Sequence, residues 1–248
     1  MELIRLQKKD DVNFFIEKKK TFVPTNIRKE FIQTVTNFAY GMTFGKDGEH
    51  RSYRSGGTKK RKNGEIFCDT FQGKLAEFFV YQSLKNLGID CSKPDLSQWN
   101  LGVWDDSDFS INGKSISVKS MAYFSNLLLL ESKDLKNDGT YIPNQKQYDF
   151  FIVVRIKPDL KSIFRSNRIL YSDNLELSRV NDLMTDLYFS ADIPGYINLE
   201  MLQCAINDNL VLTKGSLLNG KTKMDAENYY VTSSDFLDFS DIKTKLFE

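Results

Sequence analysis

Apolar residues recur at two spacings along the chain, and each spacing predicts a kind of element. Helical spacing predicts three helices, over 9–20, 25–40 and from Cys68 to about Gly88. The continuous apolar run YDFFIVVRI, at 148–156, predicts a strand buried on both faces. Weaker patterns predict helices near 174–188 and 198–207, and strands near 209–213 and 228–231. Together these elements predict an α/β fold.

A shorter segment, DSDFSINGKSISVKS at 106–120, alternates polar and apolar residues around Asn112-Gly113. This dipeptide favours a two-residue type I′ turn, so the segment is expected to form a β-hairpin. The turn fixes the register, and it places Phe109 opposite Ile116 on an apolar face.

The other face of the predicted hairpin is polar. The register places Asp108 opposite Ser117, and Lys119 is the diagonal neighbour of Asp108. Asp106 joins this face if the strand extends that far. Exposed strand faces commonly carry such residues as ordinary stabilising contacts, so the hairpin alone does not establish a site.

The helix before the hairpin adds a carboxylate. Its predicted buried face consists of Leu75, Ala76, Phe79, Val80, Leu84 and Leu87. Glu77 lies at the edge of that face, and Gly73, one turn earlier, is expected to allow another backbone to approach. Glu77 is either a solvated flanking residue or, with the hairpin carboxylate and lysine, part of a layout that suits Mg²⁺.

Composition narrows the chemistry. The 248 residues are 41% hydrophobic and carry a net charge of +1, so any nucleic-acid contact must come from local clusters of charge. The single histidine, His50, excludes nucleases built on paired histidines. Three widely spaced cysteines fit neither a disulfide framework nor a zinc site. The charged N-terminus and the lack of a long apolar run predict a cytoplasmic protein without membrane contact.

One polar, glycine-rich stretch, 41–65, is predicted to be a long loop. It concentrates positive charge that is suited to phosphate contacts, at Arg51, Arg54, Lys59, Lys60, Arg61 and Lys62. The alternative is a solvated loop without a partner.

A helix glutamate, an aspartate at a strand start, a short turn and an x-Val-Lys strand follow one another over roughly 70–156. This order resembles the PD-(D/E)xK nuclease superfamily, and the chain size and the YDFFIVVRI strand resemble type II restriction endonucleases. The resemblance implies a restriction-endonuclease-like mixed central sheet flanked by helices, with extra N- and C-terminal elements. It also implies one endonuclease domain, 1–248, with three parts: a core at about 66–160, an N-terminal helical and loop segment at 1–65, and a C-terminal segment at 161–248 for DNA recognition or dimerisation.

The resemblance assigns roles to individual residues. Asp108 matches the first metal-binding carboxylate, and Glu77 matches the helix glutamate that supports metal and water. Lys119 matches the lysine that positions or activates the attacking water, or stabilises phosphate charge. Ser117 stands where the family usually has Asp or Glu. Some Ser-Val-Lys members use a later glutamate instead, and Glu131 lies twelve positions after Lys119; otherwise Glu77 supplies the second carboxylate.

The activity implied is Mg²⁺-dependent hydrolysis of double-stranded DNA at a specific short sequence. Ser117 is not expected to be a covalent nucleophile, because no histidine lies nearby in sequence to activate it. The family further implies a homodimer on a palindromic site and a cognate DNA methyltransferase in the same system.

Three alternatives stay open. A nuclease of the same fold could serve DNA repair or mobile-element processing, and its local motif would be identical. The fold could also be a non-catalytic DNA-binding module, with Ser117 marking a decayed site. In the simplest alternative, the hairpin of a soluble α/β protein is merely structural.

Overall fold

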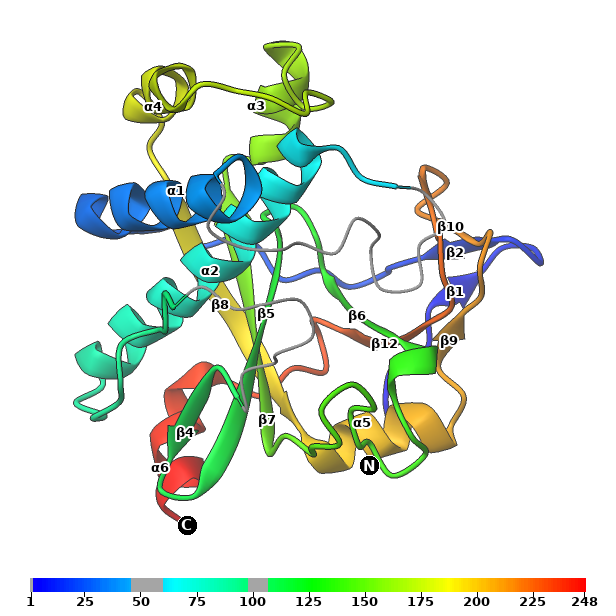
Figure 1. Ribbon diagram of the computed structural model, residues 1–248. Helices are drawn as coiled ribbons and strands as arrows, with labels where there is room; N and C mark the ends of the chain where they lie inside the picture. Colours follow the sequence, from blue (N-terminus) through cyan, green and yellow to red (C-terminus); the bar gives the residue numbers. More distant parts are fainter. Residues whose placement is uncertain (1, 46–59, 98–106) are drawn as a thin grey trace.

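The computed structural model describes residues 2–45, 60–97 and 107–248. Its centre is a five-stranded sheet in the order β3-β8-β7-β5-β4 (Figure 1). The strands are β3 (Thr25–Asn26), β8 (Ser190–Asn198), β7 (Phe150–Lys157), β5 (Lys114–Ala122) and β4 (Phe109–Ile111). Only the β5–β7 pair is parallel, so the sheet is mixed, and the α/β fold class is confirmed.

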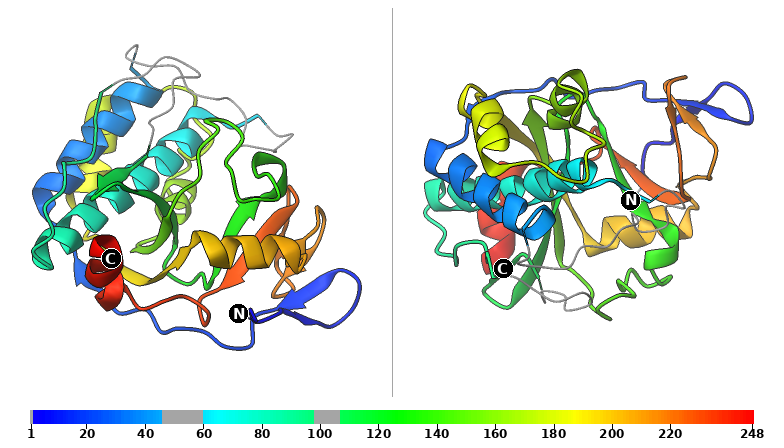
Figure 2. Two further views of the ribbon diagram at one scale, coloured as in Figure 1. Left: turned by 90° about the horizontal axis from the view of Figure 1, so that it is seen from below. Right: turned by 45° about the horizontal axis from the view of Figure 1, so that its top comes forward.

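Two long helices cover one face of this sheet (Figures 1 and 2). They are α1 (Lys29–Thr43) and α2 (Asn63–Asn86). Phenylalanines and leucines of α2 pack with the even-numbered side chains of β5 and β7, such as Ile116 and Ile152, in one apolar cluster. The predicted buried face of α2 is confirmed except for Leu87, which is only partly buried.

The opposite face carries a second layer (Figure 2). This layer holds α5 (Leu199–Asn207) and a three-stranded sheet of β6 (Leu127–Glu131), β12 (Asn228–Thr232) and β9 (Val211–Leu212). Odd-numbered residues of β7, such as Val153, pack into it, and β7 is therefore buried on both faces, as predicted.

The remaining elements are short. A four-stranded sheet in the order β1-β2-β10-β11 pairs two N-terminal strands with two later ones: β1 (Gln7–Lys8), β2 (Asn13–Phe15), β10 (Leu217–Leu218) and β11 (Thr222–Lys223). The other helices are α3 (Leu160–Ser166), α4 (Leu177–Thr185) and α6 (Ile242–Phe247), with 3₁₀ turns η1 (Ser132–Asp134) and η2 (Phe239–Asp241). Two strands of the central sheet, β3 and β8, therefore lie outside the predicted core at about 66–160. No helix among the described residues is both long and apolar enough to cross a bilayer.

The predicted hairpin is confirmed. Asn112 and Gly113 have φ angles of 50° and 75°, as a type I′ turn requires. Phe109 pairs with Ile116, as the turn rule predicts. The local sequence therefore determines the position of β5 and of Lys119 along it.

Two local expectations are wrong. Residues 9–20 do not form a helix: the Asp10 carboxylate accepts hydrogen bonds from the N–H groups of Val12 and Asn13 (2.9 and 2.8 Å), which closes a turn between β1 and β2. Among the described residues, nothing would lie within 4 Å of a Cβ at position 73, so no backbone in the described part of the chain approaches Gly73. The α1 helix is real but begins at Lys29, because Thr25–Asn26 pairs with β8.

Candidate active site

Lys119 lies in the middle of β5, opposite Val153 of β7, and its side chain is on the face that carries β6. Its ammonium lies 5.9 Å from the centre of the Tyr141 ring, a cation–π contact. Within the described part of the chain, the Lys119 Nζ has no hydrogen-bond or ion-pair partner. Burial lowers the pKa of Lys119, although the nearby carboxylates of Asp108, Glu77 and Asp134 act to raise it.

Asp108 reaches β5 through a shift of register. Its N–H bonds the carbonyl of Ile116 (3.1 Å), although that residue pairs with Phe109, so the ladder is offset by one residue as in a β-bulge. The predicted pairing of Asp108 with Ser117 is therefore wrong. The carboxylate instead accepts a hydrogen bond from the N–H of Val118 (2.6 Å), next to Lys119 in sequence.

Glu77 projects from α2 and is mostly buried. Its Oε2 accepts a 2.7 Å hydrogen bond from Lys74 Nζ, and both side chains are 14% exposed. Glu77 is close enough to Lys119 to favour the charged form of that lysine. Asp108 and Glu77 thus both favour the charged form of Lys119, although α2, which carries Glu77, covers the opposite face of the sheet from the Lys119 side chain.

Glu131 ends β6 and lines a cavity of about 140 Å³ together with Lys119, Asp134 and Tyr141. Burial, and then the neighbouring Asp134, raise the pKa of Glu131. Its Oε2 is buried and has no hydrogen-bond partner among the described residues, although it forms an ion pair with Lys133 Nζ at 3.7 Å. A buried carboxylate oxygen without a hydrogen bond, in the same cavity as an ammonium that has no ion-pair partner among the described residues, is costly to keep unless something binds there.

A second cavity, of about 380 Å³, shares Lys119 and Leu129 with the first and extends to Ser125. Its walls are apolar side chains of β5, β6 and β7 together with Ser120 and Ser125. Lys119 therefore stands between two adjoining cavities in the space between β5 and β6.

Ser117 is buried and 3% exposed. By alternation its side chain lies on the same face of β5 as Lys119. It does not line the cavity that holds Lys119 and Glu131.

The donor set suits a hard cation only in part. Across the described ranges, no three His, Cys, Asp or Glu side chains are arranged to share one metal ion. Mg²⁺, however, commonly uses one or two protein carboxylates and completes its shell with waters and substrate phosphate. Among the described residues, Glu131 and Asp134 line the cavity with Lys119, and Asp108 and Glu77 act on the charge of that lysine, so one or two of these carboxylates could supply oxygen ligands.

The predicted DNA-contacting residues separate into two groups. Arg51, Arg54 and Lys59 lie outside the described residues, as does Asp106. Lys60 is exposed. The other two basic residues form ion pairs, Arg61 with Asp69 (3.1 Å) and Lys62 with Asp173 (2.6 Å). Both pairs lie at the N-terminus of α2 and hold it in place.

Sequence reasoning missed Asp134 and Tyr141, which both line the cavity at Lys119. Asp134 was detectable, since it follows Glu131 by three residues in ESKD, the spacing of one tight turn. Tyr141 was not, because a loop brings it back beside Leu135.

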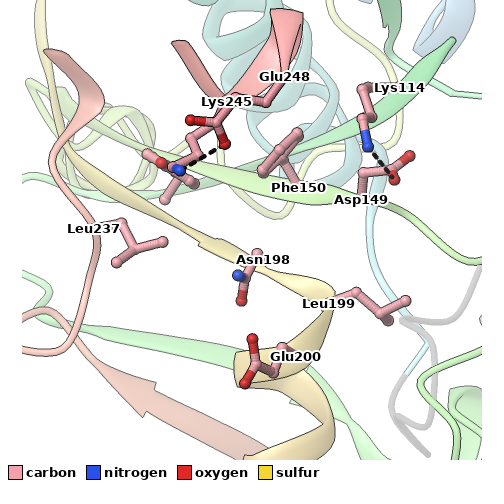
Figure 3. Close-up of a pocket in the computed structure, with 10 residues that line it drawn as sticks. Lys114, Asp149, Phe150, Asn198, Leu199, Glu200, Leu237, Lys245 and Glu248 are labelled. Carbon is pink, nitrogen blue, oxygen red and sulfur yellow. Dashed lines mark hydrogen bonds and ion pairs between the residues drawn. The ribbon is translucent and has the colours of Figure 1, made fainter. Parts of the chain in front are cut away.

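Another cavity, of about 370 Å³, lies at the start of β5 near α6 (Figure 3). Its charged side chains largely pair with one another, Lys114 with Asp149 (3.9 Å) and Lys245 with Glu248 (2.7 Å). Paired surface charges of this kind need no ligand, so the cavities at Lys119 are the stronger candidate.

Comparison of the chain with protein-family models, with curated protein sequences and with solved structures found no match.

Proposed function

We propose that this protein is a Mg²⁺-dependent endonuclease that cleaves double-stranded DNA at a specific short sequence, in the manner of type II restriction endonucleases. The observation that carries the proposal is Lys119, a partly buried ammonium without a hydrogen-bond or ion-pair partner in the described chain; Asp108 and Glu77 favour its charge, and Glu131 lines the same cavity. Perturbed charges that converge on a cavity are typical of active sites. The order helix carboxylate, hairpin aspartate and strand lysine supports the nuclease chemistry, and the mixed sheet with helices supports a restriction-endonuclease-like fold.

Asp108 and Glu77 would hold the metal ion, with Glu131 as a further oxygen donor. The ion would supply a water of lowered pKa and would offset charge on the scissile phosphate. Lys119 would donate to a phosphoryl oxygen and stabilise the charge that gathers there in the transition state. Because burial lowers the pKa of Lys119, its neutral amine forms at a lower pH than that of an exposed lysine. A neutral amine suits a group that accepts a proton from the attacking water.

A homodimer acting on a palindromic site, with a partner methyltransferase that protects host DNA, follows from the same proposal. Repair or mobile-element processing would use the same residues. Discrete fragments from plasmid DNA would favour restriction, whereas nicking that depends on DNA structure would favour repair.

A second function is a non-catalytic DNA-binding module of the same fold. Two observations favour it: Ser117 stands where the family usually has a carboxylate, and the described residues contain no ready-made three-ligand metal site. In this version Lys119 would contact a backbone phosphate without catalysis.

Plasmid digestion by the purified protein, with Mg²⁺ and with EDTA, tests the proposal. Asp108→Asn is the informative variant, and Asp149→Asn is its matched control, because Asp149 also accepts an N–H from β5, that of Ser115 (2.8 Å), but lies away from Lys119. Discrete Mg²⁺-dependent fragments that Asp108→Asn abolishes and Asp149→Asn preserves would support the endonuclease. Intact plasmid throughout, with the wild type still retarding DNA on a gel, would select the binding module.

A further inference from the structure

An apolar patch is exposed where β5 ends. Phe124, in the turn after β5, is 65% exposed, and Val23, on the neighbouring N-terminal segment, is 66% exposed. The Tyr123 ring joins the two segments, with its centre 5.3 Å from that of Phe124 and 5.9 Å from that of Phe22. Phe22, Val23, Tyr123 and Phe124 are called the apolar patch below.

The backbone under the patch is held firmly. The N–H of Tyr123 bonds Ile156 O (3.1 Å), and the 122–125 turn is closed by a 2.8 Å bond from Ser125 N to Ala122 O. On the other segment, the N–H of Val23 donates to a carboxylate oxygen of Asp192 (2.9 Å). Large apolar side chains are thus displayed on an ordered surface, which lowers the entropy cost of binding a partner there.

Positive charge lies beside the patch. The ammonium of Lys157 is 5.3 Å from the centre of the Tyr123 ring, and Lys157 is otherwise exposed. Exposed aromatic rings next to cations are the combination on which single nucleic-acid strands stack their bases while the cations face phosphates.

The patch is continuous with the candidate active site. The 380 Å³ cavity runs from Lys119 to Ser125, and Ser125 follows Phe124 in the same turn. A strand whose phosphate lies at Lys119 would therefore reach Phe124 along the edge of this cavity. The neighbouring site takes DNA under the proposed function, and this continuity favours DNA as the occupant of the patch.

We propose that the apolar patch is a DNA-contacting surface on which an unstacked base of the substrate strand lies against Phe124. This inference rests on the proposed function for the identity of the partner. Apolar side chains that enter a base stack distort the duplex, and Phe124 would help to open it beside the scissile phosphate.

The test is DNA binding without cleavage. Binding of fluorescent single-stranded and duplex oligonucleotides of mixed sequence would be followed by anisotropy in EDTA, for wild type, Phe124→Ala and Phe124→Trp. Phe247→Ala is the matched control: Phe247 is 57% exposed, and it lies on α6 near the Asn112 turn, about 30 Å along the nine-residue β5 from Phe124. Unfolding midpoints of all variants would verify that the fold is kept.

Phe124→Ala is expected to raise the Kd for single-stranded DNA about tenfold and that for duplex DNA by no more than this. Phe124→Trp should restore binding, since a larger ring stacks as well, and Phe247→Ala should bind as the wild type does. An unchanged Kd for Phe124→Ala, or a wild type that binds no DNA, would overturn the inference. Sedimentation on the same samples addresses another partner: if Phe124→Ala dissociates an oligomer but leaves DNA affinity intact, the patch joins copies of this chain and the DNA inference fails.

Failure of this inference differs from failure of the proposed function. If the protein binds DNA through Phe124 but never cleaves it, the inference about the apolar patch holds and the proposed endonuclease activity fails. If the protein cleaves DNA, and both Phe124 variants bind DNA with the wild-type affinity, the proposed endonuclease activity holds and the inference about the apolar patch fails.

Discussion

Two cations stand on the same face of the central sheet, on neighbouring strands, and their surroundings are opposite. Arg155 of β7 pairs in register with Met121, two residues beyond Lys119 on β5. Arg155 is 1% exposed, yet its guanidinium is fully used: it makes a two-point contact with Asp192, and it donates to the carbonyls of Lys20 (2.7 Å) and Thr21 (2.8 Å).

Lys119 has only the Tyr141 ring against its ammonium in the portion of the chain described. A buried charge with every donor satisfied holds structure together, here by tying the N-terminal segment to the sheet. A partly buried charge without such partners weakens the fold, and it is available to a ligand. The contrast teaches that burial alone does not mark a functional cation. A buried cation is a candidate functional group when it has no hydrogen-bond or ion-pair partners.

The largest effect is expected from breaking the satisfied cation. Arg155→Met leaves the Asp192 carboxylate buried without a counter-charge, so the free energy of unfolding should fall by about 3–5 kcal/mol. Urea unfolding at neutral pH measures this. A loss below about 1 kcal/mol would mean that the Arg155 network contributes little more than an exposed ion pair.

A pH series of urea unfolding sharpens the contrast at Lys119. Because burial lowers the pKa of Lys119 in the folded state, the unfolded chain binds more protons between that lowered pKa and the usual value of 10.5. The stability of the wild type relative to Lys119→Met should therefore rise as the pH increases toward 10.5. A difference that stays constant with pH would show that Lys119 is not penalised by the fold.

Glu131 offers the acidic counterpart. Burial and Asp134 raise the pKa of Glu131, so the unfolded chain releases its proton first as the pH rises above 4.5. Wild type should lose stability relative to Glu131→Gln over this rise, and at neutral pH the glutamine variant should unfold at higher urea concentration. Asp149→Asn is the control. A wild type more stable than Glu131→Gln at neutral pH would contradict a raised pKa of Glu131 in the folded state.

The smallest effect concerns the ring beside the lysine. A cation–π contact contributes about 0.5–1 kcal/mol, and it favours the charged amine. Tyr141→Leu should therefore lower the pKa of Lys119 further, whereas Tyr141→Phe should leave it unchanged. Carbon-13 NMR titration of the Lys119 side chain measures both variants. Equal shifts in the two would assign the effect to the hydroxyl instead of the ring.

Much of the structure around Lys119 could be predicted because it is local. Asn112-Gly113 encodes its own turn, and that turn fixes the register that places Lys119 on β5. The buried face of α2 follows from helical spacing, and Glu131, which the family resemblance picks out, lines the same cavity as Lys119.

The rest depends on contacts between distant residues. Nothing near Asn13 in the sequence shows that it pairs with Leu217, so the β1–β2 segment was taken for a helix. The one-residue offset at Asp108 depends on a single backbone hydrogen bond that no residue pattern encodes. Tyr141 reaches Lys119 only through the fold of the loop after η1.

The most direct test of the account measures cleavage and stability on the same preparation of Lys119→Met. Lys114→Met is the matched control on the same strand, where the lysine is partly exposed and lies 3.9 Å from Asp149. The account predicts that Lys119→Met cleaves plasmid DNA about 100- to 1,000-fold more slowly than the wild type and unfolds at the same or a higher urea concentration, while Lys114→Met cleaves normally. Cleavage by Lys119→Met at the wild-type rate, or its loss only through a clear drop in stability, would contradict the claim that Lys119, which has no ion-pair partner in the described chain, is kept for chemistry.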